Sequence, residues 1–415
     1  MAVPEHAIET YLPKPGRERQ GIALCLSGGG FRAALFHLGA LRRLNELGVL
    51  SQVDRISSVS GGSILAAHLA ERVNPWPASG DVVADWDGRV ATPFYDFVKH
   101  DRRTWPIAKR LLPWNWLRTT TGVETLAKEY ESHLTRLRLA DLPAMPAFTF
   151  CATDMTYGVN WTFQKSQMGD YQAGYQQPPA QWTVGRAVAA SSCFPPIFNP
   201  LNPRLKPEDL KGGHAPKGPD RDACIRGLRL TDGGTYDNMG LEPVWKSADT
   251  VLVSDGGATF DAQSDRGLVS RLSRYLAIQS AQSQSVRKRW LMAGFSTGVL
   301  KGTYWGVGSF AKNYGRSWWG YSRSLVDDRI SEIRTDLDAF SDAEIQILEN
   351  HGYSLGEAAI QVHAKELIGA TRRAAAFQLP HAAWQDEKKV ASALSQSHRR
   401  FFRPIFRRFE RQQQH

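Results

Sequence analysis

The stretch that decides the fold reads IALCLSGGGFR at residues 22–32. Five apolar residues, enough for a short buried strand, lead directly into three consecutive glycines. Residues 32–47 carry leucines at helical spacing and stop before Gly48, which predicts a helix. A second short strand at residues 53–58 and a second helix at residues 61–72 follow. This order of strand, glycine turn, helix, strand and helix is typical of the start of a parallel α/β sheet.

Further apolar runs predict that the sheet continues along the chain. Strands are expected at residues 148–152, 228–231 and 250–254. Residues 74–146 are rich in proline and tryptophan, and only residues 123–139 among them are predicted to be helical. We therefore interpret this region as an insertion that covers the sheet.

The last third of the chain is predicted to be mainly helical. We expect a helix at residues 266–290. Residues 293–320 are rich in Gly, Tyr and Trp, which favours loops. Residues 341–373 are predicted to form two helices separated at Asn350-His351-Gly352.

Ser60 stands at the junction of a predicted strand and a predicted helix, in the sequence SVSGG at residues 58–62. A sharp turn there exposes the hydroxyl at the carboxyl edge of the sheet and directs the positive helix N-terminus at it, as in a nucleophile elbow. The usual elbow has glycine at the first position, where this chain has Ser58. A structural turn or a phosphate loop has the same local composition, so this motif leaves three interpretations open.

Gly28, Gly29 and Gly30 leave backbone N–H groups unobstructed at a helix N-terminus, where they can hold an anion or a developing oxyanion. The glycines lack the ending of a P-loop and the spacing of a dinucleotide fingerprint, although a phosphate loop or a tight turn remains an alternative. About thirty residues separate Gly30 from Ser60, which is room for one helix and one strand. Parallel strands connected in this way usually lie side by side, so the glycines and Ser60 are expected in one crevice.

A nucleophilic serine also needs a base. His68 lies eight residues after Ser60, ~12 Å along the helix axis, and His37 is similarly out of reach. Asp232 and Asp255 each end a predicted strand and are each followed by two glycines. Either carboxylate could accept the serine proton directly, and the local sequence does not choose between them.

Four segments, in this order, resemble the patatin-like phospholipases. They are Gly28–Arg32, Ser58–Gly62, Ala187–Pro196 and Asp232–Gly234. The resemblance covers about residues 22–257, with a poor match over residues 74–146. It implies a three-layer α/β/α sandwich with a mainly parallel central sheet. It also implies hydrolysis of ester bonds in phospholipids or other lipids, with no metal or organic cofactor.

The resemblance assigns roles to individual residues. It implies a catalytic dyad of Ser60 and Asp232 without histidine, and an oxyanion hole at Gly28, Gly29 and Gly30. Asp232 is favoured over Asp255 because the turn in such proteins is followed by a segment that contains Asn, here Asn238. Arg32 is expected to brace the glycine loop rather than to bind substrate.

The resulting hypothesis is a carboxylic ester hydrolase, a serine-dependent lipid acyl hydrolase of the phospholipase A or lysophospholipase type. One alternative is an esterase with a Ser-Asp-His triad that uses His351, and another is a non-catalytic module that binds a phosphate or a lipid. The expected organisation is an N-terminal extension (1–20), a patatin-like catalytic domain (21–260) with an insertion at about 74–147, a helical and loop region packed on that domain (261–398), and a basic tail (399–415).

The chain carries a net charge of +10 and has a sequence pI of about 9.5, which indicates an anionic partner or simply favours solubility, and does not by itself distinguish nucleic acid from an anionic membrane. No nucleic-acid fold signature is present, so no nucleic acid is expected to bind. The four cysteines are scattered without metal-ligand spacing, and no signal peptide or membrane-spanning segment is evident. We expect a cytoplasmic protein that contacts the inner face of an anionic membrane through its basic tail.

The basic tail generates a prediction. Phe402, Ile405, Phe406 and Phe409 recur at helical spacing among six arginines between residues 399 and 411, with Pro404 as a bend. Each arginine near an anionic surface contributes ~1 kcal/mol. Deletion of the residues after His398 should therefore weaken sedimentation with anionic liposomes and make the remaining binding less salt-sensitive, while hydrolysis of a soluble ester stays nearly unchanged.

A second candidate contact is the region of residues 104–118, in which Trp105, Trp114 and Trp116 lie among basic residues. If the truncated protein binds the liposomes as well as the full chain does, the tail is not the anchor.

Overall fold

The computed structural model describes residues 18–104, 121–179, 181–195, 197–257, 267–315, 317–369, 372, 375–395 and 397. The tail, most of the N-terminal extension, and Trp105, Trp114 and Trp116 lie outside the described residues. No described helix combines the length and the apolar content needed to cross a bilayer.

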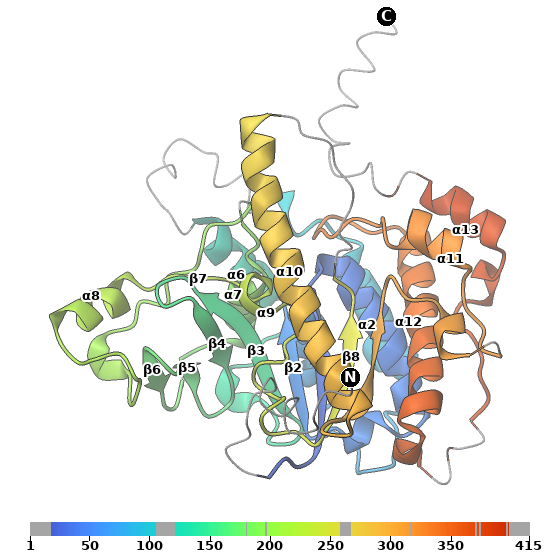
Figure 1. Cartoon of the computed structure of the whole chain (residues 1–415), viewed down its shortest axis with the longest axis horizontal. Coiled ribbons are helices and arrows are strands. Elements are labelled where there is room, and N and C mark those ends of the chain that lie inside the picture. The colour runs from blue at the N-terminus through green and yellow to red at the C-terminus, as the bar shows by residue number, and fades with distance from the viewer. Residues whose placement is uncertain are drawn as a thin grey trace, which may run out of the picture.

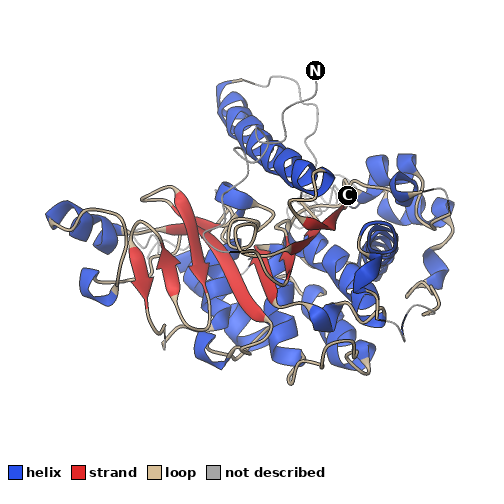
Figure 2. Ribbon diagram, turned by 60° about the horizontal axis from the view of Figure 1, so that its bottom comes forward, coloured by secondary structure: helices blue, strands red, loops and turns tan. Residues whose placement is uncertain are grey.

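A central sheet runs in the order β6-β5-β4-β3-β2-β1-β8-β9, with β7 paired to β3 (Figure 2). Strands β3, β2, β1, β8 and β9 are parallel to one another, whereas β4 and β7 pair antiparallel with β3, and β5 and β6 continue the antiparallel pairing beyond β4. The predicted α/β class with a mainly parallel sheet is confirmed. The strands are β1 Ile22–Leu26, β2 Arg55–Val59, β3 Ala147–Asp154, β4 Val159–Phe163, β5 Met168–Asp170, β6 Gly174–Gln176, β7 Leu230–Asp232, β8 Thr250–Asp255 and β9 Lys301–Gly306.

Helices cover both faces of this sheet. The long helix α10 crosses one face, and most of the other helices, with α2 and α12 among them, lie on the opposite side (Figures 1 and 2). The α-helices are α2 Gly30–Glu46, α3 Gly61–Arg72, α4 Thr92–Val98, α6 Thr121–His133, α7 Val184–Ser192, α8 Pro219–Gly227, α9 Gly234–Asp237, α10 Leu268–Ser296, α11 Arg323–Leu325, α12 Asp342–His363 and α13 Glu387–Leu394.

Strand β1 shows why the sheet is buried on both faces. Leu24 and Leu26 belong to the main hydrophobic core, whereas Ala23 and Cys25 belong to a second core with Leu291 of α10. Successive side chains of a strand point to opposite faces, so an uninterrupted apolar run requires cover on both sides. The apolar run that opens the chain is therefore explained by its central place in the sheet.

Helix α2, which starts at the glycine loop, packs against α12 with a close approach of the two backbones. A Cβ added at Gly39 of α2 would overlap the backbone of Glu349, and one added at Gly352 of α12 would overlap the carbonyl group of Phe36. Only glycine permits this approach. The C-terminal region therefore holds α2, and with it the glycine loop, in place.

Three expectations were wrong. Helix α12 runs without interruption through Asn350-His351-Gly352, because Gly352 serves helix packing and not a helix end. The region 293–320 contains β9, which pairs parallel with β8 and buries Thr303 and Trp305. The insertion holds a second helix, α4, besides α6.

The packing of α2 against α12 is testable with two glycine substitutions. Gly352→Ala should lower the free energy of unfolding by ~1–3 kcal/mol, because the new methyl group overlaps the carbonyl of Phe36. Gly227→Ala, also on a helix but with open space around its Cα, is the matched control and should leave stability unchanged or slightly raised. Equal destabilisation of the two variants in thermal or denaturant unfolding would show that the close approach does not matter.

Candidate active site

Ser60 forms the whole turn between β2, which ends at Val59, and α3, which starts at Gly61. Its backbone has φ 49° and ψ −114°, a combination that residues other than glycine rarely adopt. A Cβ at Gly61 would overlap the carbonyl of Gly30, so the glycine after Ser60 lets the two turns touch. Strain of this kind persists only where the surrounding structure imposes it, and it is often found at functional sites.

Ser191 of α7 imposes that conformation. The Ser60 N–H donates to Ser191 Oγ at 2.9 Å, and Ser191 Oγ donates to the carbonyl of Cys151 at 2.6 Å. The Ser191 carbonyl accepts from Gly233 N at 3.2 Å, so one residue ties the Ser60 turn to the turn after Asp232. Ser191 was not among the residues predicted to act at the site. The signal was the run of small residues along α7, which allows close packing against the site.

Asp232 meets Ser60 because of the strand register. Val59 of β2 pairs with Cys151 of β3, and Asp232 of β7 pairs with the next residue, Ala152. Because β4 occupies the opposite edge of β3, β2 and β7 share one edge. They run in opposite directions, so their carboxyl ends meet there. The structure thus brings Ser60 and Asp232 together.

The Asp232 carboxylate is almost completely buried, with 2% of the residue exposed. Its Oδ1 accepts from Gly234 N at 2.7 Å, whereas Oδ2 has no hydrogen-bond partner of good geometry among the described residues. Burial raises the pKa of Asp232 to about 6, against the lowering effects of the Gly234 N–H and the Ser60 hydroxyl. A buried carboxylate with one unpaired oxygen is suited to accept a proton from a neighbouring hydroxyl.

The glycine loop lies against Ser60. A Cβ added to Gly28 would be 3.1 Å from the Ser60 Cβ, which places Gly28 next to the serine. The Gly28 N–H donates to the carbonyl of Asn238 at 3.0 Å and is therefore occupied. No hydrogen bond of the Gly29 or Gly30 N–H is found in the part of the chain that the structure describes. These two glycines have φ values of 141° and 58°, which favour glycine.

Asp255, the other aspartate before a glycine pair, is engaged elsewhere. Its Oδ1 accepts from Gly257 N at 3.0 Å and its Oδ2 accepts from the hydroxyl of Tyr304 at 2.8 Å. Strand β8 is separated from β2 by β1. Asp255 therefore lies roughly 10 Å from the Ser60 strand, with both carboxylate oxygens occupied.

Three buried histidines each hydrogen-bond a backbone carbonyl group. His351 Nε2 donates to Val307 O at 2.8 Å, and His68 Nε2 donates to Val90 O at 2.8 Å. His37 lies 3.0 Å from Ser27 O and 2.7 Å from a serine hydroxyl. Burial lowers the pKa of each to about 4. His351 lies beside the ring of Phe36 in the α2–α12 contact, which argues against a triad with this residue.

Arg32 is buried at the start of α2 and connects three segments. Its guanidinium donates to the carbonyls of Ser331 at 2.6 Å, Ile333 at 2.9 Å and Gly256 at 3.1 Å. Nearby, the Phe31 N–H donates to the carbonyl of Asp336 at 2.9 Å. Residues 331–336 of the C-terminal region therefore form part of the wall behind the glycine loop.

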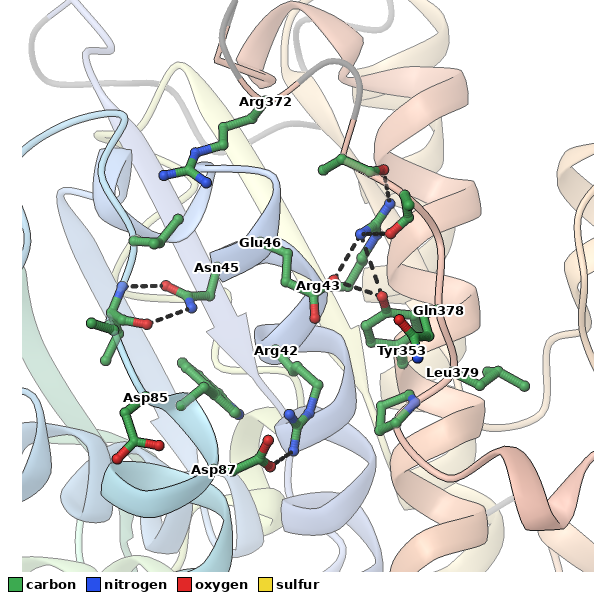
Figure 3. A pocket seen from close by; sticks show the side chains of 17 residues that line it. Arg42, Arg43, Asn45, Glu46, Asp85, Asp87, Tyr353, Arg372, Gln378 and Leu379 are labelled. Atoms are coloured by element: carbon green, nitrogen blue, oxygen red, sulfur yellow. Dashed lines mark hydrogen bonds and ion pairs between the residues drawn. The ribbon is translucent and has the colours of Figure 1, made fainter.

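A polar cavity of about 640 Å³ lies at the other end of α2, ~18 Å along the helix from Gly30 (Figure 3). Arg42 is paired there with Asp87 at 2.6 Å and with Glu349 at 2.7 Å. Arg43 is paired with Glu46 and Glu357. The cavity is thus distinct from the turn that carries Ser60, and its arginines hold α2 against α12 and the insertion. Within the described residues, no group of three or more His, Cys, Asp or Glu is placed to hold a metal ion.

A family model described as Patatin-like phospholipase matches residues 24–245, more than half of the chain, and this span includes Ser60 and Asp232. The chain belongs to the patatin-like phospholipase family. A search of curated proteins found no significant match.

Several solved structures are similar to this patatin-like protein at low sequence identity. Human GIVD cytosolic phospholipase A2 is 13% identical over 89% of this chain and 62% of that protein, with a TM-score of 0.47. Its complex with methyl gamma-linolenyl fluorophosphonate gives 14% identity, 90% and 64% coverage, and a TM-score of 0.47. VipD from Legionella pneumophila is 14% identical over 92% of this chain and 75% of that chain, with a TM-score of 0.34. The chain spans less than two thirds of the length of the human enzyme.

Burial of Asp232 predicts a pH-dependent cost in stability. Its pKa is about 6 in the folded protein and ~3.9 in an unfolded chain, so folding favours the protonated carboxyl group. The stabilisation that comes from protonation of the Asp232 carboxyl group in the folded protein is fully present below pH ~4 and is lost as the pH rises through about 6. Asp232→Asn, which cannot ionise, should therefore be ~2–3 kcal/mol more stable than the wild type at pH 8. The two proteins should converge near pH 4 in denaturant unfolding.

Asp255→Asn is the matched control for this experiment. Both oxygens of that carboxylate accept hydrogen bonds, so its replacement should lower stability at pH 8. If the wild type is more stable than Asp232→Asn at pH 8, the ionised Asp232 carboxylate has a stabilising partner in the folded protein, which contradicts the prediction.

Proposed function

We propose that this protein is a serine-dependent lipid acyl hydrolase in which Ser60 is the nucleophile and Asp232 is the base. The observation that supports this most directly is the meeting of β2 and β7 on one edge of β3. It puts a strained serine next to a buried carboxylate that has an unpaired oxygen. The patatin-like phospholipase match supports the lipid as substrate, of the phospholipase A or lysophospholipase type.

In the first half of the reaction, Ser60 Oγ attacks the carbonyl carbon of the ester, and its proton passes to Asp232. The carbonyl oxygen becomes an oxyanion, which accepts hydrogen bonds from the N–H groups of Gly29 and Gly30. The carbon–oxygen bond to the alcohol then breaks, and the alcohol leaves with the proton from Asp232. The acyl group remains on Ser60 as an ester.

In the second half, a water molecule loses a proton to Asp232 and attacks the acyl-serine. The tetrahedral intermediate collapses, the fatty acid leaves, and Ser60 Oγ regains its proton from Asp232. A pKa of about 6 makes Asp232 a stronger base than an ordinary carboxylate and keeps it ionised at neutral pH. No histidine is required.

The neighbours of the dyad act by position. Gly28 leaves space for Ser60, but its N–H is occupied by Asn238, so the oxyanion hole is assigned to Gly29 and Gly30. Arg32 fixes the start of α2 through its three carbonyl contacts, and Ser191 fixes the turn of Ser60.

Exposed apolar side chains on the segments that border β7 are consistent with a lipid acyl chain. Phe194 is 57% exposed and follows Cys193, whose carbonyl accepts a hydrogen bond from Thr231, the residue before Asp232. Met155, 56% exposed, directly follows β3.

The described cysteines are unpaired, which supports a reducing, cytoplasmic compartment.

A non-catalytic phosphate- or lipid-binding module is the remaining alternative, and hydrolysis of a short-chain nitrophenyl ester separates the two. Ser60→Ala should lower kcat/KM by roughly three orders of magnitude or more, and Asp232→Asn should be nearly as damaging, because the two residues act as one unit. For the wild type, kcat/KM should rise with pH through about 6 and then level off, since Asp232 must be ionised to act as the base.

Asp255→Asn is the matched aspartate control and should keep most of the activity. Full activity of the Ser60→Ala protein would contradict the proposed nucleophile. A greater loss in Asp255→Asn than in Asp232→Asn would contradict the proposed base.

A further inference from the structure

Helix α10 is much longer than the strands it connects. It links β8 to β9, and these parallel neighbours pair from Thr250 with Lys301 to Asp255 with Gly306. Its 29 residues span ~43 Å, whereas a strand of six residues spans ~20 Å. The helix must end near Lys301 at the amino edge of the sheet. Its N-terminal half therefore extends past the carboxyl edge, where Ser60 lies, as Figure 1 shows.

This projecting half exposes large apolar side chains. Tyr275, Leu276 and Ile278 are 54%, 69% and 40% exposed, respectively. At ~100° per residue the three positions fall within about half of the helix circumference. Leu291, in the other half of α10, is completely buried in the second core. A solvent-facing cluster of this kind on one helix marks a contact surface.

The charge of α10 indicates which partner this surface takes. Asp and Glu make up about one residue in ten of the chain, yet none occurs among the 29 residues of α10. The same residues include five cations: Arg271 and Arg274 lie in the projecting part, and Arg287, Lys288 and Arg289 lie in the other half, where Arg287 is paired with Glu242 at 3.1 Å. An apolar face on a helix with only positive charges is typical of helices that lie in the head-group region of an anionic bilayer.

Helix α10 also borders the proposed active site. The Arg287 guanidinium lies over the ring of Tyr236 at 4.9 Å, four residues after Asp232. The turn that follows β8 contacts the glycine loop, because a Cβ added at Gly29 would lie against the carbonyl of Gly256. The C-terminal half of α10 thus packs beside the turn after Asp232, and the projecting part of the helix continues from there past the carboxyl edge of the sheet.

We propose that the projecting N-terminal part of α10, residues 268–278, is a bilayer-contact helix. It inserts Tyr275, Leu276 and Ile278 at the head-group boundary of an anionic phospholipid bilayer and so turns the carboxyl edge of the sheet, with Ser60, toward the lipid. A second copy of this chain is a poorer occupant, because a contact between two such segments would bring Arg271 and Arg274 of both copies together with no acidic residue of α10 beside them. The purpose of the contact rests on the proposed lipid hydrolase function, but the contact itself does not require catalysis.

Vesicle sedimentation with the full-length Ser60→Ala protein tests binding without hydrolysis of the vesicles. The probes are vesicles of phosphatidylcholine with phosphatidylglycerol and vesicles of phosphatidylcholine alone. The triple variant Tyr275→Gln, Leu276→Gln and Ile278→Gln, which keeps good helix formers, should bind the anionic vesicles at least about tenfold more weakly. The matched control is Val362→Gln, an exposed apolar residue of α12, which should bind as the parent does.

In proteins that retain Ser60, the triple variant should hydrolyse a soluble ester at the wild-type rate and phospholipid in anionic vesicles at least about tenfold more slowly. Unchanged vesicle binding in the triple variant would overturn the proposal, and so would an equal loss in Val362→Gln. If the wild type is a dimer and the triple variant is a monomer, the surface is a contact between two copies of the chain instead. Failure of the proposed function is a separate result, since it appears as ester hydrolysis by Ser60→Ala and leaves vesicle binding unaffected.

Discussion

Two strands that run in opposite directions share one edge of β3, and the arrangement of the site depends on this constraint. Strand β2 pairs with β3 up to Cys151, and β7 pairs from Ala152 onward, so the carboxyl ends of both strands have to turn away at the same place. The chain after β2 makes this turn with Ser60 at φ 49°. Ser191 accepts the Ser60 N–H and also binds the turn after Asp232, which locks the two turns to each other. A hydroxyl and a carboxylate therefore meet although they are more than 170 residues apart in the chain.

The same constraint leaves a carboxylate buried with an unpaired oxygen, which is unfavourable for folding. The surrounding structure offsets this with rigid packing. The carbonyl of Asp232 accepts from Thr153 Oγ1 at 2.9 Å, and the glycines of α2 and α12 allow the helix that carries the glycine loop to be held at close range. A destabilising, strained pair inside a tightly packed frame is expected where a site is arranged for chemistry rather than for stability.

The sequence predicted best what depends on neighbouring residues. The first two strands and helices follow from local periodicity and glycine turns, and all four are present within a few residues of the expected bounds. The glycine loop and Ser60 were expected in one crevice, and they do lie together. Features set by distant contacts were missed. The Gly28 N–H donates to the carbonyl of Asn238, 210 residues away, and the Ser60 N–H donates to Ser191 Oγ. Gly352 has the sequence context of a helix end, but it is a glycine because the backbone of Phe36 lies against it. Strand β9 carries too few apolar residues to be predicted without its neighbour β8.

Covalent labelling with a fluorophosphonate is the most direct measurement of whether Ser60 is an activated nucleophile next to Asp232. Attack of the serine oxygen on phosphorus expels fluoride and leaves a stable phosphonyl ester, which peptide mass spectrometry can locate. The proposed dyad predicts one adduct, on the peptide that contains Ser60, formed faster as the pH rises through about 6 and largely lost in Asp232→Asn. An adduct on a different serine, or labelling of Ser60 that does not depend on Asp232, would contradict the proposed dyad.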